Sequence, residues 1–271
     1  MLTRWDIAGR TLLVDFQRPL SLARTLEFEG ATPSWFGAPA AHDKALMAGT
    51  FSGSVAAGAS CNCRTITLTP HCHGTHTECV GHLTLERADA HRVVPQRFLP
   101  ALLISVPPER ALGCHESTDP APRPQDQLIT RRLIEAAWPA DAPLAPQALV
   151  LRSLPNDPEK FAANTAAAPP YLTREAALWL VARGIEHLVL DLPSADRIAD
   201  DGRLTAHRIF FGLPAGSARL AEAQRSACTI TELAYVADGI RDGAYLLSLQ
   251  TPAIAGDAVP SRPVLYAARA L

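Results

Sequence analysis

The sequence lacks long apolar runs, a strong excess of charge and a dense set of cysteines. No segment reaches the roughly 18 uninterrupted apolar residues that a membrane-spanning helix requires, and residues 1–16 contain no apolar stretch after a basic start. The formal net charge is -2, without a run of like charges, so the chain has no electrostatic footprint for nucleic acid or an anionic membrane. These absences favour a cytoplasmic protein that acts on a small molecule.

Cysteine is also too sparse for a disulfide scaffold, at six residues in 271. In a reducing compartment such thiols are packed, metal-bound or reactive. Four of them, Cys61, Cys63, Cys72 and Cys79, fall within or just before a cluster of histidines. A structural zinc knot is one interpretation, although Cys-x-Cys followed by single cysteines matches neither usual zinc-ribbon spacing. The other interpretation is that five of the thiols are small packed hydrophobes, namely Cys61, Cys63, Cys79, Cys114 and Cys228.

Short β-branched and leucine-rich runs alternate with a few helical patterns. The runs predict strands at residues 11–15, 64–69, 102–106, 148–152, 187–191, 244–250 and 263–267. Residues 130–138 and 173–183 are typical of helices with threonine N-caps, and Gly184 ends the second in a left-handed conformation. The 23 prolines concentrate in loops that join these elements at short intervals, so we expect a single α/β domain over residues 1–271.

The chemistry-bearing segment is residues 71–82, HCHGTHTECVGH, which follows a strand-like run. Four histidines and one glutamate within twelve residues offer the imidazole and carboxylate ligands that suit zinc and its first-row neighbours. In an extended segment His76 and Glu78 project to the same side, so both can reach one ion. Gly74 would let the backbone turn sharply between the first donor and the second.

Several motifs occur in a known order. Gly74, Thr75, His76, Glu78 and His82 fall in register with His-x-Gly-Thr-His-x-Asp-x-Pro-x-His. Residues 33–37 are similar to Pro-x-Trp-Pro-Gly, and residues 190–196 to Gly-x-Asp-x-x-Ser-x-Asp. A later histidine and an Ile-x-Glu glutamate have counterparts in His207 and Glu232. By these motifs the chain resembles the family of bacterial kynurenine formamidases, isatin hydrolases and putative cyclases.

The resemblance implies a single layered β/β/α (swivelling) domain with a mixed sheet, assembled as a homodimer or homotetramer. It also implies one or two divalent ions, zinc first and manganese second. The implied ligands are His71, His76, Glu78, His207 and Glu232, with Cys72 as an alternative to His71. His82 corresponds to the catalytic acid/base, and Trp35 to the tryptophan that lines the substrate pocket, although Trp35 could equally belong to the core.

Three positions depart from the family pattern. Cys72 stands where the first histidine is expected, with His71 and His73 on either side, and we favour His71 through a one-residue bulge. Glu78 replaces the bridging aspartate, and Val80 replaces the proline.

The leading hypothesis is an arylformamidase-like hydrolase of an N-formyl aryl amine or a cyclic amide. The alternatives are a family member that has lost its chemistry and binds a small molecule or partner, and a zinc-stabilised structural protein.

Overall fold

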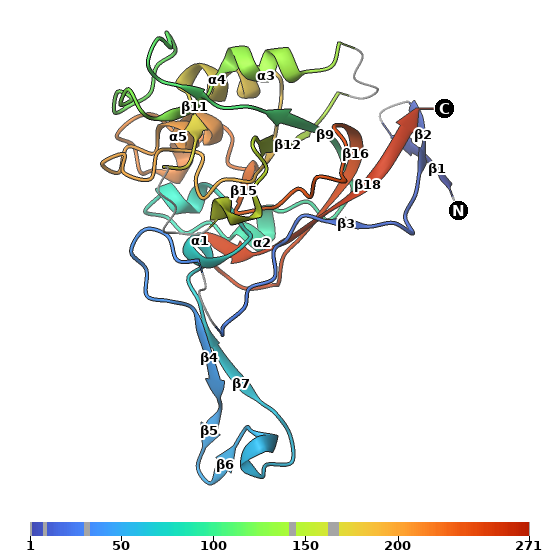
Figure 1. The fold of residues 1–271 in the computed structure, drawn as a ribbon, viewed down its shortest axis with the longest axis vertical. Helices are drawn as coiled ribbons and strands as arrows, with labels where there is room; N and C mark the ends of the chain where they lie inside the picture. Colours follow the sequence, from blue (N-terminus) through green and yellow to red (C-terminus); the bar gives the residue numbers. More distant parts are fainter. Residues whose placement is uncertain (1, 8–9, 30–32, 141–144, 162–167, 271) are drawn as a thin grey trace.

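One large mixed β-sheet forms the body of the protein in the computed structural model, which describes residues 2–7, 10–29, 33–140, 145–161 and 168–270 (Figure 1). Four adjacent strands run parallel, namely β9 (Leu99–Val106), β12 (Ala148–Ser153), β14 (His187–Leu190) and β15 (Thr229–Glu232). Antiparallel strands extend the sheet beyond β9 as β16 (Gly243–Gln250), β18 (Arg262–Ala270), β2 (Arg10–Val14) and β1 (Thr3–Ile7), with β3 (Leu20–Ser21) on β18. Beyond β15 lie β8 (His76–Glu78) and β17 (Ala258–Pro260). The predicted α/β class with a mixed sheet is confirmed.

The parallel strands are buried on both faces, which explains their continuous apolar runs. Successive side chains of β9 alternate between two clusters, because a strand has a period of two. Leu102 and Ile104 join the cluster beneath the helices, whereas Leu103 joins the cluster on the opposite face. The strands predicted from these runs are therefore present, with shifted ends.

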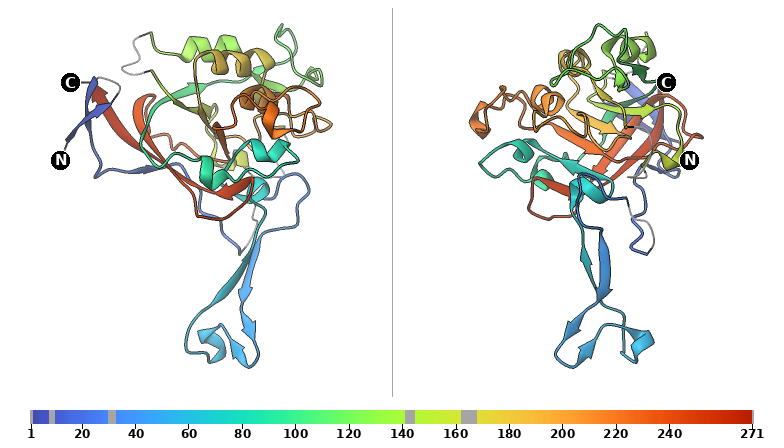
Figure 2. Two further views of the ribbon diagram at one scale, coloured as in Figure 1. Left: turned by 180° about the vertical axis from the view of Figure 1, so that it is seen from behind. Right: turned by 60° about the vertical axis from the view of Figure 1, so that its left-hand side comes forward.

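Three helices cover one face of the sheet, namely α3 (Arg131–Ala137), α4 (Arg174–Ala182) and α5 (Thr205–Phe211) (Figure 2). The predicted caps are confirmed, because Thr130 Oγ1 accepts from the Leu133 amide at 3.4 Å and Thr173 Oγ1 from the Ala176 amide at 3.1 Å. Gly184 follows α4 with φ +75°, as a left-handed C-terminal glycine should. The sequence pattern gave no signal for α5, which carries His207.

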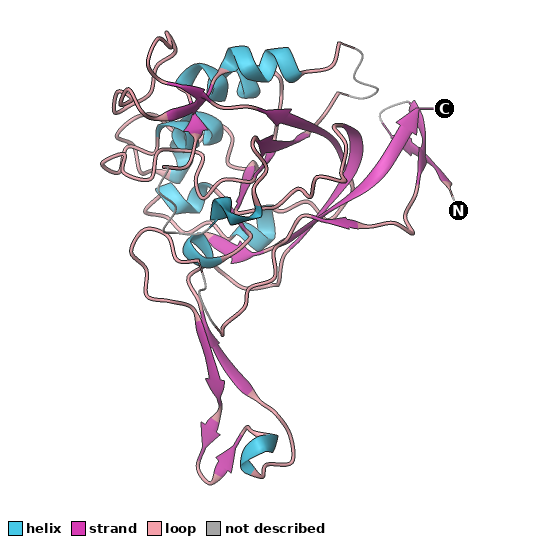
Figure 3. Cartoon of the chain, in the orientation of Figure 1, coloured by secondary structure: helices cyan, strands magenta, loops and turns pink. Residues whose placement is uncertain are grey.

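A narrow arm projects from the body (Figure 3). It consists of β4 (His42–Ala45) paired with β7 (Arg64–Thr67), and its tip holds β5 (Met47–Ala48), β6 (Phe51–Ser52) and η1 (Val55–Ala57). The strand predicted over residues 64–69 is therefore shorter and belongs to the arm, not to the main sheet. Cys61 lies exposed on the arm, so the expectation that it is packed is wrong.

Short elements complete the described structure. They are β10 (Glu109–Arg110), β11 (Gln127–Ile129), β13 (Tyr171–Leu172), α1 (Pro70–His73), η2 (Val80–Leu83), α2 (Ala90–Val93), η3 (Pro158–Phe161) and η4 (Leu220–Glu222). In the described part of the chain, no helix has both the length and the apolar character needed to cross a bilayer. The swivelling arrangement and the single-domain assignment of residues 1–271 stay predictions.

Candidate metal centre

Strand β8 brings two donors to one face of the sheet. It lies between β15 and β17, and its residues His76, Thr77 and Glu78 are all buried. Because side chains alternate, Thr77 points to the other face, where its Oγ1 lies 2.7 Å from Thr231 Oγ1. On β15, Glu232 pairs with His76, and its carboxylate lies on the His76 side, with Oε2 3.7 Å from His76 Nε2.

The single turn α1 supplies the third donor. His71 Nδ1 lies 3.0 Å from Glu78 Oε2. His73, on the same turn, faces away, because its Nδ1 accepts from the Thr69 amide at 2.9 Å and its Nε2 lies 2.9 Å from Pro39 O. Cys72 is buried, and among the described residues no group of clustered donors includes a cysteine. The geometry thus brings His71 to the centre and leaves Cys72 and His73 out of it.

The backbone at Gly74 does not turn in the way that the sequence suggested. Gly74 has φ −157° and ψ −177°, which is an extended conformation open to any residue. A Cβ atom there would meet nothing closer than the Leu26 side chain, at 4.0 Å. The change of direction between His71 and His76 instead comes from the one-turn helix α1, which Pro70 begins.

Helix α5 presents His207 to the same point. Asp196 caps the helix by accepting from the amides of Ala206 at 2.7 Å and His207 at 3.1 Å, and its Oδ2 also lies 2.7 Å from His207 Nδ1. The capping aspartate therefore orients the ring, with Nε2 2.8 Å from Glu78 Oε1 and 3.4 Å from Glu232 Oε1. From the sequence, Asp196 is either a group that supports the site or part of a polar turn, and its contacts with α5 favour the first interpretation.

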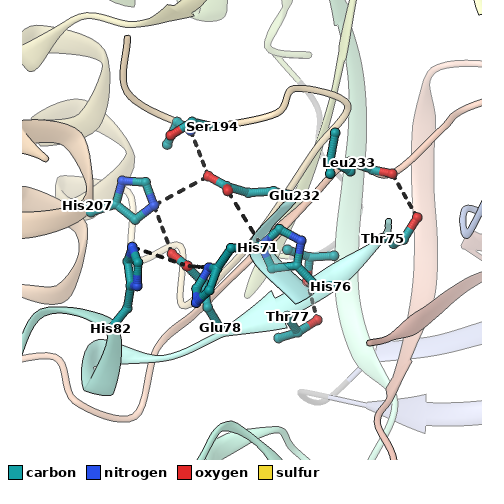
Figure 4. A network of polar contacts seen from close by, with 12 residues as sticks. His71, Thr75, His76, Thr77, Glu78, His82, Ser194, His207, Glu232 and Leu233 are labelled. Carbon is teal, nitrogen blue, oxygen red and sulfur yellow. Dashed lines mark hydrogen bonds and ion pairs between the residues drawn. The ribbon is translucent and has the colours of Figure 1, made fainter. Parts of the chain in front are cut away.

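Among the described residues the donors form three groups, and two of these share Glu78 (Figure 4). The first group is His71, His76 and Glu78, and the second is Glu78, His207 and Glu232. Within each group the ligand atoms lie within 4.8 Å of one another. These are the residues that the resemblance implied as metal ligands.

The buried polar atoms of this centre fit a cation. His76 donates from Nδ1 to Gly74 O at 3.0 Å, so its Nε2 carries a free lone pair, and that buried atom has no hydrogen-bond partner. Both Glu78 oxygens are also buried without an aligned hydrogen bond, although histidine nitrogens lie 2.8 and 3.0 Å away. Buried polar atoms without a partner are costly. A divalent ion held by imidazole and carboxylate ligands would partner all three atoms.

Burial and charge act in opposite directions on the ionisable groups here. Burial lowers the pKa of His76, so its ring is neutral and ready to ligate. Burial also disfavours the charged form of His71, but the carboxylates of Asp257 and Glu78 outweigh this and raise the pKa of His71 to about 10. Glu78 and Asp196 similarly raise the pKa of His207 against its burial. Without a metal, protons on these two histidines therefore balance the carboxylates.

His82 lies at the edge of the centre, on η2. Its Nε2 is 4.0 Å from Glu78 Oε2, and 27% of its side chain is exposed. A Cβ atom on Gly81 would come within 2.4 Å of Ala88 O, so only glycine permits the close packing that places His82. Val80, which replaces the family proline, is fully buried in the main core.

Trp35 is buried beside the centre. It packs with Phe161 and with Leu233, the residue after Glu232, and its amide donates to Cys72 O at 3.0 Å. Its indole Nε1 is buried without a partner. The side chain is therefore buried in a core cluster next to the centre.

Sequence reasoning missed Asp257. Its Oδ2 lies 2.8 Å from His71 Nε2 and 3.4 Å from His82 Nδ1, across a sequence separation of 186 residues from His71. A single aspartate in a loop carries no local signal, so only the pairing of β17 with β8 reveals this contact.

Comparisons with known proteins give the family and the fold of the chain. Residues 20–197 match the model of the family described as Putative cyclase. A search of curated proteins gives no significant match. The chain is similar to the structure of a predicted metal-dependent hydrolase from Bacillus stearothermophilus, with 14% identity, TM-score 0.58 and coverage of 92% of this chain and 98% of the other.

Two further structures have the same fold. A potential metal-dependent hydrolase with cyclase activity has 15% identity and a TM-score of 0.60, covering 92% of this chain and 97% of the other. An isatin hydrolase bound to the product analogue thioisatinate has 15% identity and a TM-score of 0.59, covering 93% of this chain and 92% of the other. The family model covers well over half of the chain, and the chain therefore belongs to the putative cyclase family, with the fold of its metal-dependent hydrolases.

Proposed function

We propose that this protein is a metal-dependent hydrolase that cleaves an amide bond, either in an N-formyl aryl amine or in a cyclic amide. The observation that carries the proposal is the pair of donor groups that share Glu78, with His82 beside them. Isatin is a cyclic amide, and an isatin hydrolase is among the structures with the same fold. The zinc-knot alternative has no support in the described residues, because no clustered donor group contains a cysteine.

In this proposal His71, His76 and Glu78 hold one divalent ion, and Glu78, His207 and Glu232 hold a second. Zinc suits these ligands best, and manganese is the next choice. When bound, such an ion lowers the pKa of a coordinated water to about 7 and polarises a carbonyl oxygen. Two carboxylates and three imidazoles leave coordination positions open for water and substrate.

His82 is the proton carrier. Its Nε2 faces the centre, 4.0 Å from Glu78 Oε2, and its partial exposure leaves room for a substrate beside it. From there it can accept the proton of the attacking water and return it to the leaving amine nitrogen. Trp35 offers a flat apolar surface for an aryl ring, worth about 1 kcal/mol beyond its buried area.

The alternative is a family member that binds a small molecule without turnover, motivated by Cys72, Glu78 and Val80. The geometry favours the hydrolase, because Glu78 contacts both His71 and His207, and Val80 packs in the hydrophobic core. The test is hydrolysis of N-formylkynurenine, isatin and a panel of lactams and lactones by chelator-stripped protein, before and after zinc or manganese is added. Metal-restored turnover is expected. Fully metal-loaded protein that hydrolyses none of them would exclude the proposal.

A further inference from the structure

One carboxylate oxygen contacts two histidines of the centre. Asp257 Oδ2 lies 2.8 Å from His71 Nε2 and 3.4 Å from His82 Nδ1. The two rings stack beside each other, with centroids 4.2 Å apart and an interplanar angle of 30°. The oxygen therefore faces the edges of both rings at once.

The Asp257 side chain stands on a fixed backbone. The Asp257 carbonyl accepts from the Cys79 amide at 3.0 Å, and the preceding Gly256 carbonyl accepts from the Ala90 amide at 2.7 Å. Directly afterwards Ala258 enters β17, opposite Glu78 of β8. The carboxylate is thus held beside the donor strand even though 44% of its side chain is exposed.

This contact determines which nitrogen of each ring faces the centre. A ring N–H that donates to a carboxylate leaves the other nitrogen as the free lone pair. For His71 that nitrogen is Nδ1, 3.0 Å from Glu78 Oε2. His82 Nδ1 makes a longer ion-pair contact with Asp257, at 3.4 Å, and its Nε2 lies 4.0 Å from Glu78 Oε2.

Each of the other ligand histidines has its own acceptor. His76 donates from Nδ1 to Gly74 O, and His207 Nδ1 lies against Asp196. Asp257 differs from these two acceptors because it serves a ligand histidine and the proton carrier together.

We propose that Asp257 is a positioning residue that orients His71 for metal binding and His82 for proton transfer through one shared oxygen. The part that concerns His82 rests on the proposed function, whereas the part that concerns His71 needs only the metal. The competing role is that of a direct ligand, because His71, His82 and Asp257 themselves lie close enough to hold an ion.

The test compares D257A and D257N with the wild type, using E222A as the matched control. Glu222 is an exposed carboxylate that pairs with Arg219 on η4. Zinc stoichiometry and affinity are measured by chelator competition. The kinetic constants kcat and KM are measured at saturating zinc, with whichever substrate of the panel above the wild type hydrolyses. We expect D257A to bind zinc about 10- to 100-fold more weakly with unchanged stoichiometry, the usual effect of removing a partner behind a ligand.

At saturating zinc, kcat of D257A should fall about tenfold or more while KM changes little, because His82 loses its orienting partner. D257N keeps an acceptor oxygen, so it should recover most of the zinc affinity. Equal zinc affinity in D257A and the wild type would overturn the inference, as would the loss of one ion per chain, which would make Asp257 a ligand. If no substrate is ever found, the zinc affinities still decide the role of Asp257 toward His71.

Discussion

Shortening Glu78 to aspartate restores the family residue, and the structure predicts that the change weakens the metal centre. Glu78 contacts His207 Nε2 at 2.8 Å through one oxygen and His71 Nδ1 at 3.0 Å through the other. Removing one methylene retracts the carboxylate by roughly 1.3 Å along the side chain. Because β8 is paired on both sides, with β15 and β17, the backbone cannot follow the shortened side chain.

The expected magnitude follows from these distances. At an effective dielectric constant of about 20, lengthening either contact by roughly 1.3 Å costs about 2 kcal/mol of attraction. That corresponds to about a 25-fold change in an equilibrium constant. This attraction acts in the metal-free protein, where both histidines are protonated, so E78D should lose about 2 kcal/mol of metal-free stability. E78D should also bind zinc more weakly than the wild type, because the shorter carboxylate no longer reaches both donor groups, and E78Q more weakly still, because it removes the charge.

The assay is chelator competition on stripped protein, with E222D as the control for a glutamate-to-aspartate change on the surface. The same variants should show a matching loss in metal-free stability at pH 6, where His71 and His207 are protonated in the folded protein. An E78D protein that binds zinc as tightly as the wild type would refute the reasoning, since it would show that aspartate reaches both groups from β8.

Three further predictions concern His82, proton release on zinc binding, and the projecting arm. H82A should lower kcat by about 100- to 10,000-fold, which is the usual contribution of a general acid/base. Elemental analysis of H82A should show the same metal content as the wild type, and loss of the metal would instead make His82 a ligand. Zinc binding near pH 7.5 should release protons, because His71 and His207 have raised pKa values in the metal-free protein and must deprotonate to ligate. Zinc affinity should therefore rise with pH up to about 10, the pKa of His71. Calorimetry in buffers of different ionisation enthalpy measures the proton release, and a binding heat that does not depend on the buffer would contradict it. The homodimer or homotetramer implied by the resemblance should use the arm, whose two-stranded pairings are marginal alone and expose 67% of Met47 on β5 and 57% of Ile66 on β7. Light scattering should show a smaller mass for M47D/I66D than for the wild type, and equal masses would remove the arm from the interface.

The sequence predicts the parallel strands well because burial on both faces leaves continuous apolar runs, as in β12. It predicts α3 and α4 because a threonine caps each of them. It gives β8 only as an extended segment and misses β17, since these strands have three residues each and donors replace the apolar pattern in β8. It also misses α5, whose N-cap position is Leu204 in a left-handed conformation, while the capping carboxylate comes from Asp196, ten residues before Ala206.

The site residues also divide into those that the sequence predicts and those that only the structure or the resemblance reveals. His76 and Glu78 follow from spacing, because two residues apart on a strand share a face. His207 and Glu232 came from the resemblance alone, since no local pattern connects α5 and β15 with β8. The identity of the first ligand could not be read from three consecutive residues, and the single turn of α1 separates them by turning His71 toward Glu78 and His73 toward Pro39. Asp257 is beyond sequence reasoning because it depends on a sheet pairing.

The most direct test of the central claim is the anomalous diffraction signal of a zinc- or manganese-loaded crystal. We expect an ion within ligand distance of His71 Nδ1, His76 Nε2 and Glu78, and a second ion between Glu78, His207 and Glu232. An ion bound by Cys72 or His73, or one bound only through His82 and Asp257, would contradict it.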